Sequence, residues 1–113
     1  MHELTITQSV LNIVTKNAEA AGAHQVTAIN LVVGELTGFI DDSIQFYFDM
    51  LGPGTLAEGA KLVIRRVPAL LRCRICSEEF GLREGSWLCP QCSAVGGDVL
   101  RGREFLVESI EVE

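Results

Sequence analysis

The chain has 113 residues, of which 48% are hydrophobic and 21% charged, and its formal net charge is −6. This length suits one domain, or a small domain with an attached module, and the hydrophobic content predicts a packed core rather than disorder. No apolar run is long enough to cross a bilayer, and the first five residues lack the basic head of a secretory signal. We therefore expect a soluble, cytoplasmic protein that does not enter a membrane.

The charges are unevenly distributed along the chain. Residues 1–60 carry seven acids and one base, residues 61–103 carry eight bases and four acids, and residues 104–113 add four acids. The acidic front half argues against wrapping a nucleic acid and mildly favours cations, although physiological salt screens such fields beyond about 8–10 Å.

Apolar spacing predicts two helices. Residues 4–21 carry an apolar stripe with a period near 3.6, and Gly22 is expected to end this helix. A second helix is expected after the turn at 34–38, with Asp41 or Asp42 as its cap. Its buried stripe and its end are predicted from spacing and turn residues: Ile44, Tyr47, Phe48 and Leu51, then Gly52-Pro53-Gly54.

Three segments are rich in β-branched residues and predict strands, at 25–34, 61–67 and 104–112. The last two flank the cysteine segment, and we expect them to pair directly in one sheet, with 96–98 as a flexible exit. The predicted fold class is α+β: a small three-stranded sheet with two helices on one face, plus an inserted zinc-ribbon module. The predicted domains are 1–70 with 99–113, and 71–98.

Two cysteine pairs give the strongest local signal. Cys73 and Cys76 are separated by two residues, as are Cys89 and Cys92, and twelve residues lie between the pairs. In a reducing compartment this spacing predicts a tetrahedron of thiolates around zinc, with Phe80 and Trp87 available to cover it. Four thiolates leave no open coordination position, so the site is expected to be structural. Rubredoxin-like iron is the alternative, because the ligand set does not distinguish the two metals.

His2 is the other candidate metal ligand. The amine of Met1, the amide nitrogen of His2 and its imidazole could all bind one ion, and the amide of Glu3 or another side chain could complete a square plane. Planar nitrogen ligation suits Ni(II) or Cu(II). On position alone, however, a histidine at residue 2 is usually just a frayed terminal residue.

The terminal histidine and the cysteine pairs together are more specific than either feature alone. The terminal Met-His-Glu-Leu, the amphipathic helix, the Val33-Gly34-Glu35-Leu36 turn and the four-cysteine ribbon resemble the HypA family over essentially the whole chain. These proteins are nickel-insertion accessory proteins of hydrogenase maturation. The resemblance implies a nickel metallochaperone, with nickel at Met1, His2 and Glu3 and structural zinc at Cys73, Cys76, Cys89 and Cys92.

The resemblance also implies partners. These are a maturation GTPase, for which the first helix is the implied docking surface, and the precursor of the [NiFe]-hydrogenase large subunit, with urease as a further client in some bacteria. One feature departs from the family. Some members carry histidines beside their cysteine pairs, whereas Ser77 and Ser93 stand here and no histidine follows His24. Ligand exchange by a local histidine is therefore not expected.

Other readings stay open at this point. The net charge of +4 over residues 61–103 would suit a zinc-ribbon nucleic-acid binder, although the acidic ends argue against one. No catalytic triad, Walker loop or dinucleotide fingerprint is present, so we do not expect an enzyme. His24 and Glu35 are either ordinary loop residues or additional nickel ligands. Whether the chain is a monomer or a homodimer is left open.

Overall fold

The computed structural model describes residues 3–113, which fold into two compact units. The first, here called the helical unit, consists of Met1–Val32, Phe39–Arg65 and Leu106–Glu113. The second, called the ribbon unit, consists of Val33–Gly38 and Arg66–Phe105. The division inferred from the sequence, with a nickel-binding domain at 1–70 and 99–113 and a zinc-binding module at 71–98, stays a prediction.

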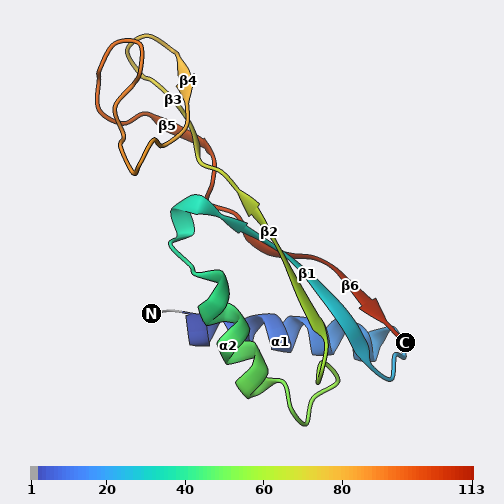
Figure 1. The fold of residues 1–113 in the computed structure, drawn as a ribbon. Coiled ribbons are helices and arrows are strands. Elements are labelled where there is room, and N and C mark those ends of the chain that lie inside the picture. Colours follow the sequence, from blue (N-terminus) through green and yellow to red (C-terminus); the bar gives the residue numbers. More distant parts are fainter. Residues whose placement is uncertain (1–2) are drawn as a thin grey trace. The chain divides into compact units, whose positions relative to one another are not determined.

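The helical unit is built from two helices and a three-stranded sheet (Figure 1). Helix α1 spans Glu3–Ala20 and helix α2 spans Asp41–Leu51; the sheet contains β1 (Val26–Gly34), β2 (Lys61–Val67) and β6 (Phe105–Val112). The two helices pack against each other. The predicted α+β class, with two helices and this sheet, is confirmed.

The helix ends follow from local chemistry. Gly22 has a left-handed backbone (φ 69°), and two backbone bonds close the end of α1: Gly22 donates to Glu19 and Ala23 donates to Ala18. This is the Schellman arrangement for which glycine is favoured. Helix α2 differs from expectation at its start, because its N-cap is Ile40 and no side chain of its own caps it. Asp41 and Asp42 instead lie in its first turn.

The strand order in the sheet is β2-β1-β6. The expectation that the strands on either side of the cysteine segment pair directly is therefore wrong, since β1 lies between them. The burial of β1 explains this order. Seven of its nine residues are buried, on both faces, as is typical of a central strand, whereas β2 shows no fully buried residue.

The core of the helical unit combines the predicted apolar stripes of the helices with the buried residues of β1. Ile44 and Phe48 of α2 are 1% and 3% exposed, and Val14 and Ala18 of α1 are fully buried. Burying a side chain as large as that of Val, Ile or Phe contributes roughly 1.5–3 kcal/mol to folding. The buried stripes therefore determine how the helices pack. Within residues 3–113, no helix is both long enough and apolar enough to span a membrane.

The ribbon unit contains short strands and one turn of 3₁₀ helix. Strand β3 (Leu70–Arg72) is central and pairs antiparallel with β4 (Glu79–Phe80) and with β5 (Asp98–Arg101). The 3₁₀ helix η1 covers Glu35–Thr37. Both pairs of cysteines belong to this unit.

Candidate metal centre

The four cysteine side chains converge on one point. Their Sγ atoms all lie within 4.8 Å of one another, and the closest pairs are Cys73–Cys92 and Cys76–Cys89, each at 3.5 Å. All four are free thiols. A tetrahedron with zinc–sulfur bonds of about 2.3 Å has sulfur–sulfur edges of about 3.8 Å, so the spacing fits a single zinc ion.

Each cysteine pair sits in a loop closed by the same backbone bond. The N–H of Cys73 donates to the carbonyl oxygen of Glu78 at 2.8 Å, and the N–H of Cys89 donates to that of Ala94, also at 2.8 Å. The residues outside each loop pair as well, Arg72 with Glu79 and Leu88 with Val95. The second loop therefore repeats the geometry of the first loop, sixteen positions further along the chain. Both loops present their sulfurs to the same centre.

Backbone N–H groups within each loop also point at sulfur. Ile75 donates to Sγ of Cys73 and Gln91 donates to Sγ of Cys89, both at 3.4 Å. Such donors stabilise a thiolate, the form that binds metal. Ser77 and Ser93, at matching positions after each pair, both have a left-handed backbone, with φ of 65° and 64°.

The thiols have pKa values that differ widely. The backbone N–H groups of Cys76 and Ile75 hold the pKa of Cys73 at about 6. The N–H of Glu78 lowers the pKa of Cys76, but desolvation and the neighbouring thiols outweigh it and raise that pKa to about 12. Four negative charges this close repel strongly, so a full set of thiolates needs a divalent cation among them.

Two of the four cysteines are buried in the apolar core of the ribbon unit. Phe80 is 5% exposed and joins Ala69, Leu71, Cys73 and Cys89 in the core of the ribbon unit. Trp87, in contrast, is 40% exposed and is not part of this cluster. Phe80 was thus predicted correctly as a cover, and Trp87 was not.

The predicted flexible exit after the second loop is wrong. Asp98 begins β5, and a Cβ placed on Gly97 would lie 2.4 Å from the carbonyl oxygen of Arg72. Gly97 is therefore required for close packing of two backbones rather than for mobility. Arg74 also donates a hydrogen bond to Asp98 at 2.9 Å, on the exposed surface of this segment.

Glu35 has a role within the ribbon unit. Its Oε1 accepts the backbone N–H of Ala69 at 2.8 Å, and the N–H of Leu36 donates to Gly102 at 2.7 Å. A Cβ on Gly34 would lie only 2.1 Å from the carbonyl oxygen of Gly102. The Val33-Gly34-Glu35-Leu36 segment thus packs closely against, and hydrogen-bonds to, the backbone at Ala69 and Gly102. Its sequence alone does not reveal these contacts.

The predicted nickel ligands Met1 and His2 lie outside the described residues. Glu3 is described: it begins α1, is 3% exposed, and accepts the backbone N–H of Ile40 on Oε2 at 3.3 Å. His24 is exposed, and its backbone N–H donates to the carbonyl of Glu113 at 2.7 Å. Across residues 3–113 the only group of three or more potential metal-ligating side chains is the four-cysteine cluster, so neither His24 nor Glu35 belongs to one.

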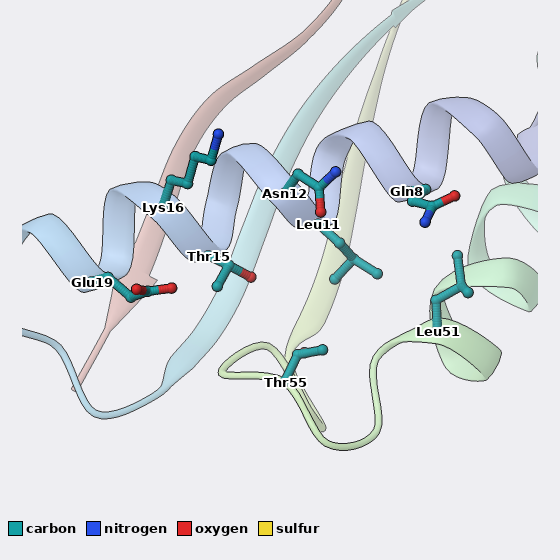
Figure 2. A pocket seen from close by; sticks show the side chains of 8 residues that line it. All are labelled: Gln8, Leu11, Asn12, Thr15, Lys16, Glu19, Leu51 and Thr55. Carbon is teal, nitrogen blue, oxygen red and sulfur yellow. The ribbon is translucent and has the colours of Figure 1, made fainter.

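A cavity of about 360 Å³ lies in the helical unit, and none of the four cysteines lines it (Figure 2). Amide, hydroxyl and charged side chains of α1 form most of its wall, and it contains a single carboxylate. The lining therefore does not provide the set of ligands that a metal site needs. Its lining residues are Gln8, Leu11, Asn12, Thr15, Lys16, Glu19, Leu51 and Thr55.

Comparison with known proteins gives a consistent result. Residues 1–112 match the family model described as hydrogenase/urease nickel incorporation, metallochaperone, HypA. The chain is 47% identical to the hydrogenase maturation factor HypA of Geotalea uraniireducens over the full length of both chains. It is 42% identical to that of Dehalococcoides mccartyi, covering 100% of this chain and 95% of the relative.

Solved structures support the same fold. The solution structure of the nickel metallochaperone HypA from Helicobacter pylori superposes with a TM-score of 0.68 at 22% identity, covering 99% of this chain and 97% of that one. A second solution structure of a HypA protein gives a TM-score of 0.70. With the four-cysteine ribbon, the sheet order and this full-length similarity in place, the chain belongs to the HypA family.

Proposed function

We propose that this protein is a nickel metallochaperone that binds Ni(II) at its N-terminus and carries structural zinc at Cys73, Cys76, Cys89 and Cys92. The observation that carries the proposal is the family match over residues 1–112 together with a complete, correctly spaced set of four thiols. In this proposal nickel is held by Met1, His2 and Glu3. The ion is cargo rather than a resident cofactor, and the protein is not an enzyme.

The proposed pathway is a transfer between proteins in the cytoplasm, where the thiols stay reduced. The chaperone works with a maturation GTPase and passes nickel to the precursor of the [NiFe]-hydrogenase large subunit, with urease as a second possible client. A chelate at a chain terminus suits this task, because a delivered ion must be able to leave, and an exposed site releases it more readily than a closed four-thiolate cage.

The nucleic-acid alternative is disfavoured by the way the basic residues are used. Arg72 pairs with Glu79 at 3.2 Å, and Arg74 pairs with Asp98 at 2.9 Å. Arg65 of β2 pairs with Glu108 at 2.9 Å. These exposed pairs contribute little to stability, but they neutralise the arginines that a phosphate backbone would need.

Calorimetric titration with nickel tests the proposed site. The protein should carry its native, unextended N-terminus and one bound zinc. His2→Ala should weaken nickel binding at least ten-fold, because it removes the imidazole nitrogen from the chelate. His24→Ala is the matched control and should bind as the wild type does. Equal affinities for wild type and His2→Ala would refute the terminal site.

A further inference from the structure

A second cavity lies in the ribbon unit, where the chain enters β3. Its lining residues, all of the ribbon unit, are Val67, Pro68, Ala69, Leu70 and Arg101. Four of these side chains are apolar, and a mostly apolar wall with few polar groups is the usual form of a ligand site. The cavity volume is about 220 Å³, below the range of about 300–1,000 Å³ that is typical of sites for drug-sized ligands. It therefore suits a ligand of about one amino-acid residue.

The single charge at this cavity is that of Arg101. Pro68 has no N–H to offer, and the N–H of Ala69 already donates to Oε1 of Glu35 at 2.8 Å. In the part of the chain that the structure describes, Arg101 makes no ion pair, whereas Arg74 of the same unit pairs with an acid at 2.9 Å. The guanidinium of Arg101 is thus available to an anion from outside.

A bulge in β5 sets the position of Arg101. Leu70 pairs with Arg101 and Leu71 pairs with Val99, so Leu100 is an extra residue in β5 at this point. Such bulges change the direction of a side chain and are frequent next to active sites. Arg101 is exposed, and β5 is at the edge of the sheet. The bulge therefore places an accessible cation directly across from a residue of the apolar wall.

The cation and the apolar wall together define the ligand. Arginine binds carboxylates and phosphates through paired N–H donors. One guanidinium balances the single charge of a carboxylate, whereas a phosphate dianion would keep excess charge beside an apolar wall, which is unfavourable. An aliphatic residue at the C-terminus of a polypeptide carries both matching groups, a carboxylate and an apolar side chain, on one Cα atom.

We propose that this cavity binds the aliphatic C-terminal residue of a partner polypeptide. The side chain of that residue lies against the apolar wall, and its α-carboxylate pairs with Arg101. The site is independent of the proposed nickel chelate, because no candidate metal ligand lines the cavity. Failure of nickel binding in the titration above would leave this proposal unchanged.

Chemical-shift titrations of the isotope-labelled, zinc-loaded protein at about 0.15 M ionic strength test each part of the ligand. N-acetyl-leucine should shift the amide signals of Ala69, Leu70 and Arg101, with a dissociation constant of a few millimolar for so small a ligand. N-acetyl-leucinamide lacks the charge and N-acetylglycine lacks the side chain. Each should bind about ten-fold more weakly, and inorganic phosphate should cause no shift at these amides.

A fourth probe distinguishes a chain end from an internal acid. N-acetyl-aspartyl-leucinamide carries a carboxylate and a leucine side chain on neighbouring residues, and its own C-terminus is blocked. It should bind as weakly as N-acetyl-leucinamide. Binding as strong as that of N-acetyl-leucine would overturn the assignment to a C-terminal residue.

Arg101→Gln tests the cation. It keeps part of the side chain but removes the charge, and it should weaken N-acetyl-leucine binding about ten-fold. Arg83→Gln is the matched control, since Arg83 is also exposed and without an ion pair among the described residues, and it should bind as the wild type does. Zinc content and the amide signals of the helical unit report whether each variant is folded.

Two further results would overturn the proposal. They are equal affinities for N-acetyl-leucine and its amide, and wild-type affinity in Arg101→Gln. If Arg101→Gln fails to fold, the comparison of the acid with its amide on the wild-type protein still decides.

Discussion

Two glycines of the ribbon unit lie where another backbone occupies the place of a side chain. A Cβ on Gly34 would meet the carbonyl oxygen of Gly102 at 2.1 Å, and a Cβ on Gly97 would meet that of Arg72 at 2.4 Å. Neither glycine has a positive φ. These glycines are needed because two backbone segments approach closely there, not because the backbone adopts an unusual conformation.

Gly34→Ala should lower the free energy of unfolding by about 3 kcal/mol, because the backbone at 102 must move to admit the methyl group. Gly38→Ala is the matched control. Gly38 has a φ of 73° and no atom within 4 Å of its Cβ position, so alanine should cost only about 1–2 kcal/mol of left-handed strain. Urea unfolding of the zinc-loaded proteins measures both. Equal losses would contradict the packing explanation.

Phe80 and Trp87, two aromatic residues of the ribbon unit, differ in how deeply they are buried. Phe80→Ala should cost about 3 kcal/mol, because it empties a site in the ribbon core, whereas Trp87→Ala should cost about 1 kcal/mol or less. Thermal or urea unfolding with zinc bound would compare them. A larger loss from Trp87→Ala would mean that its ring covers the centre after all.

At the scale of elements, the paired cysteine loops act as one ligand set. Zinc needs thiolates, yet the pKa of Cys76 is raised to about 12 and that of Cys92 is also raised, in the latter case mainly by the Cys73 thiol acting against the N–H of Ala94. At neutral pH both are therefore protonated in the metal-free loops. Zinc binding must displace their protons, and this links the affinity to pH.

The sign and size of this linkage can be predicted. Each displaced proton changes affinity ten-fold per pH unit, so zinc affinity should fall at least a hundred-fold per unit as pH drops from 8 to 6.5. Below about pH 6, Cys73 also becomes protonated and the slope should steepen. Competition titrations with a chelator of known proton stoichiometry would measure the slope. A pH-independent affinity would contradict the ligand assignment.

The elements that the sequence predicted well are those specified locally. The helical spacing of 4–21 and 44–51 and the stop at Gly22 depend on neighbours within a few positions. The structure has both helices and this stop, but Leu4 and Ile13, which were expected on or beside the buried stripe, are 42% and 50% exposed. The cysteine cluster was also predictable, because a loop of two residues between cysteines imposes its geometry on any backbone that accepts it.

Three of the errors involve partners distant in sequence. Strand pairing was misassigned because β1 could be recognised as central only from burial on both faces. The cap of α2 comes from Glu3, 37 positions away along the chain. Gly97 was misread as flexible because its close neighbour is Arg72. No local pattern encodes such contacts, since they depend on the assembled fold.

At the scale of the whole molecule, the two units have separate cores and one of them depends on metal. The ribbon core is small and includes two of the metal ligands, so zinc supplies much of its folding free energy. Both α-helices belong to the helical unit, whose core contains no cysteine. The consequences of losing zinc should therefore be confined to one unit.

Cys73→Ser tests this separation. The variant should lose zinc and amide protection across residues 66–105, while α1 and α2 keep their far-ultraviolet circular dichroism and the terminus still binds nickel. Metal analysis with hydrogen exchange would show both effects, and Cys73→Ser with wild-type zinc content would contradict the assignment. Loss of helical signal along with zinc would show that the two units fold as one.

The order of the strands has a consequence for biosynthesis. β1 needs β6 as its second neighbour, but β6 follows the ribbon in the chain, so the ribosome must produce all four cysteines before that neighbour exists. During this interval one edge of the most apolar strand stays unpaired, which is a state prone to association with other nascent chains. The interval ends when β6 has been synthesised, so slower translation of residues 68–112 should lower the yield of folded protein.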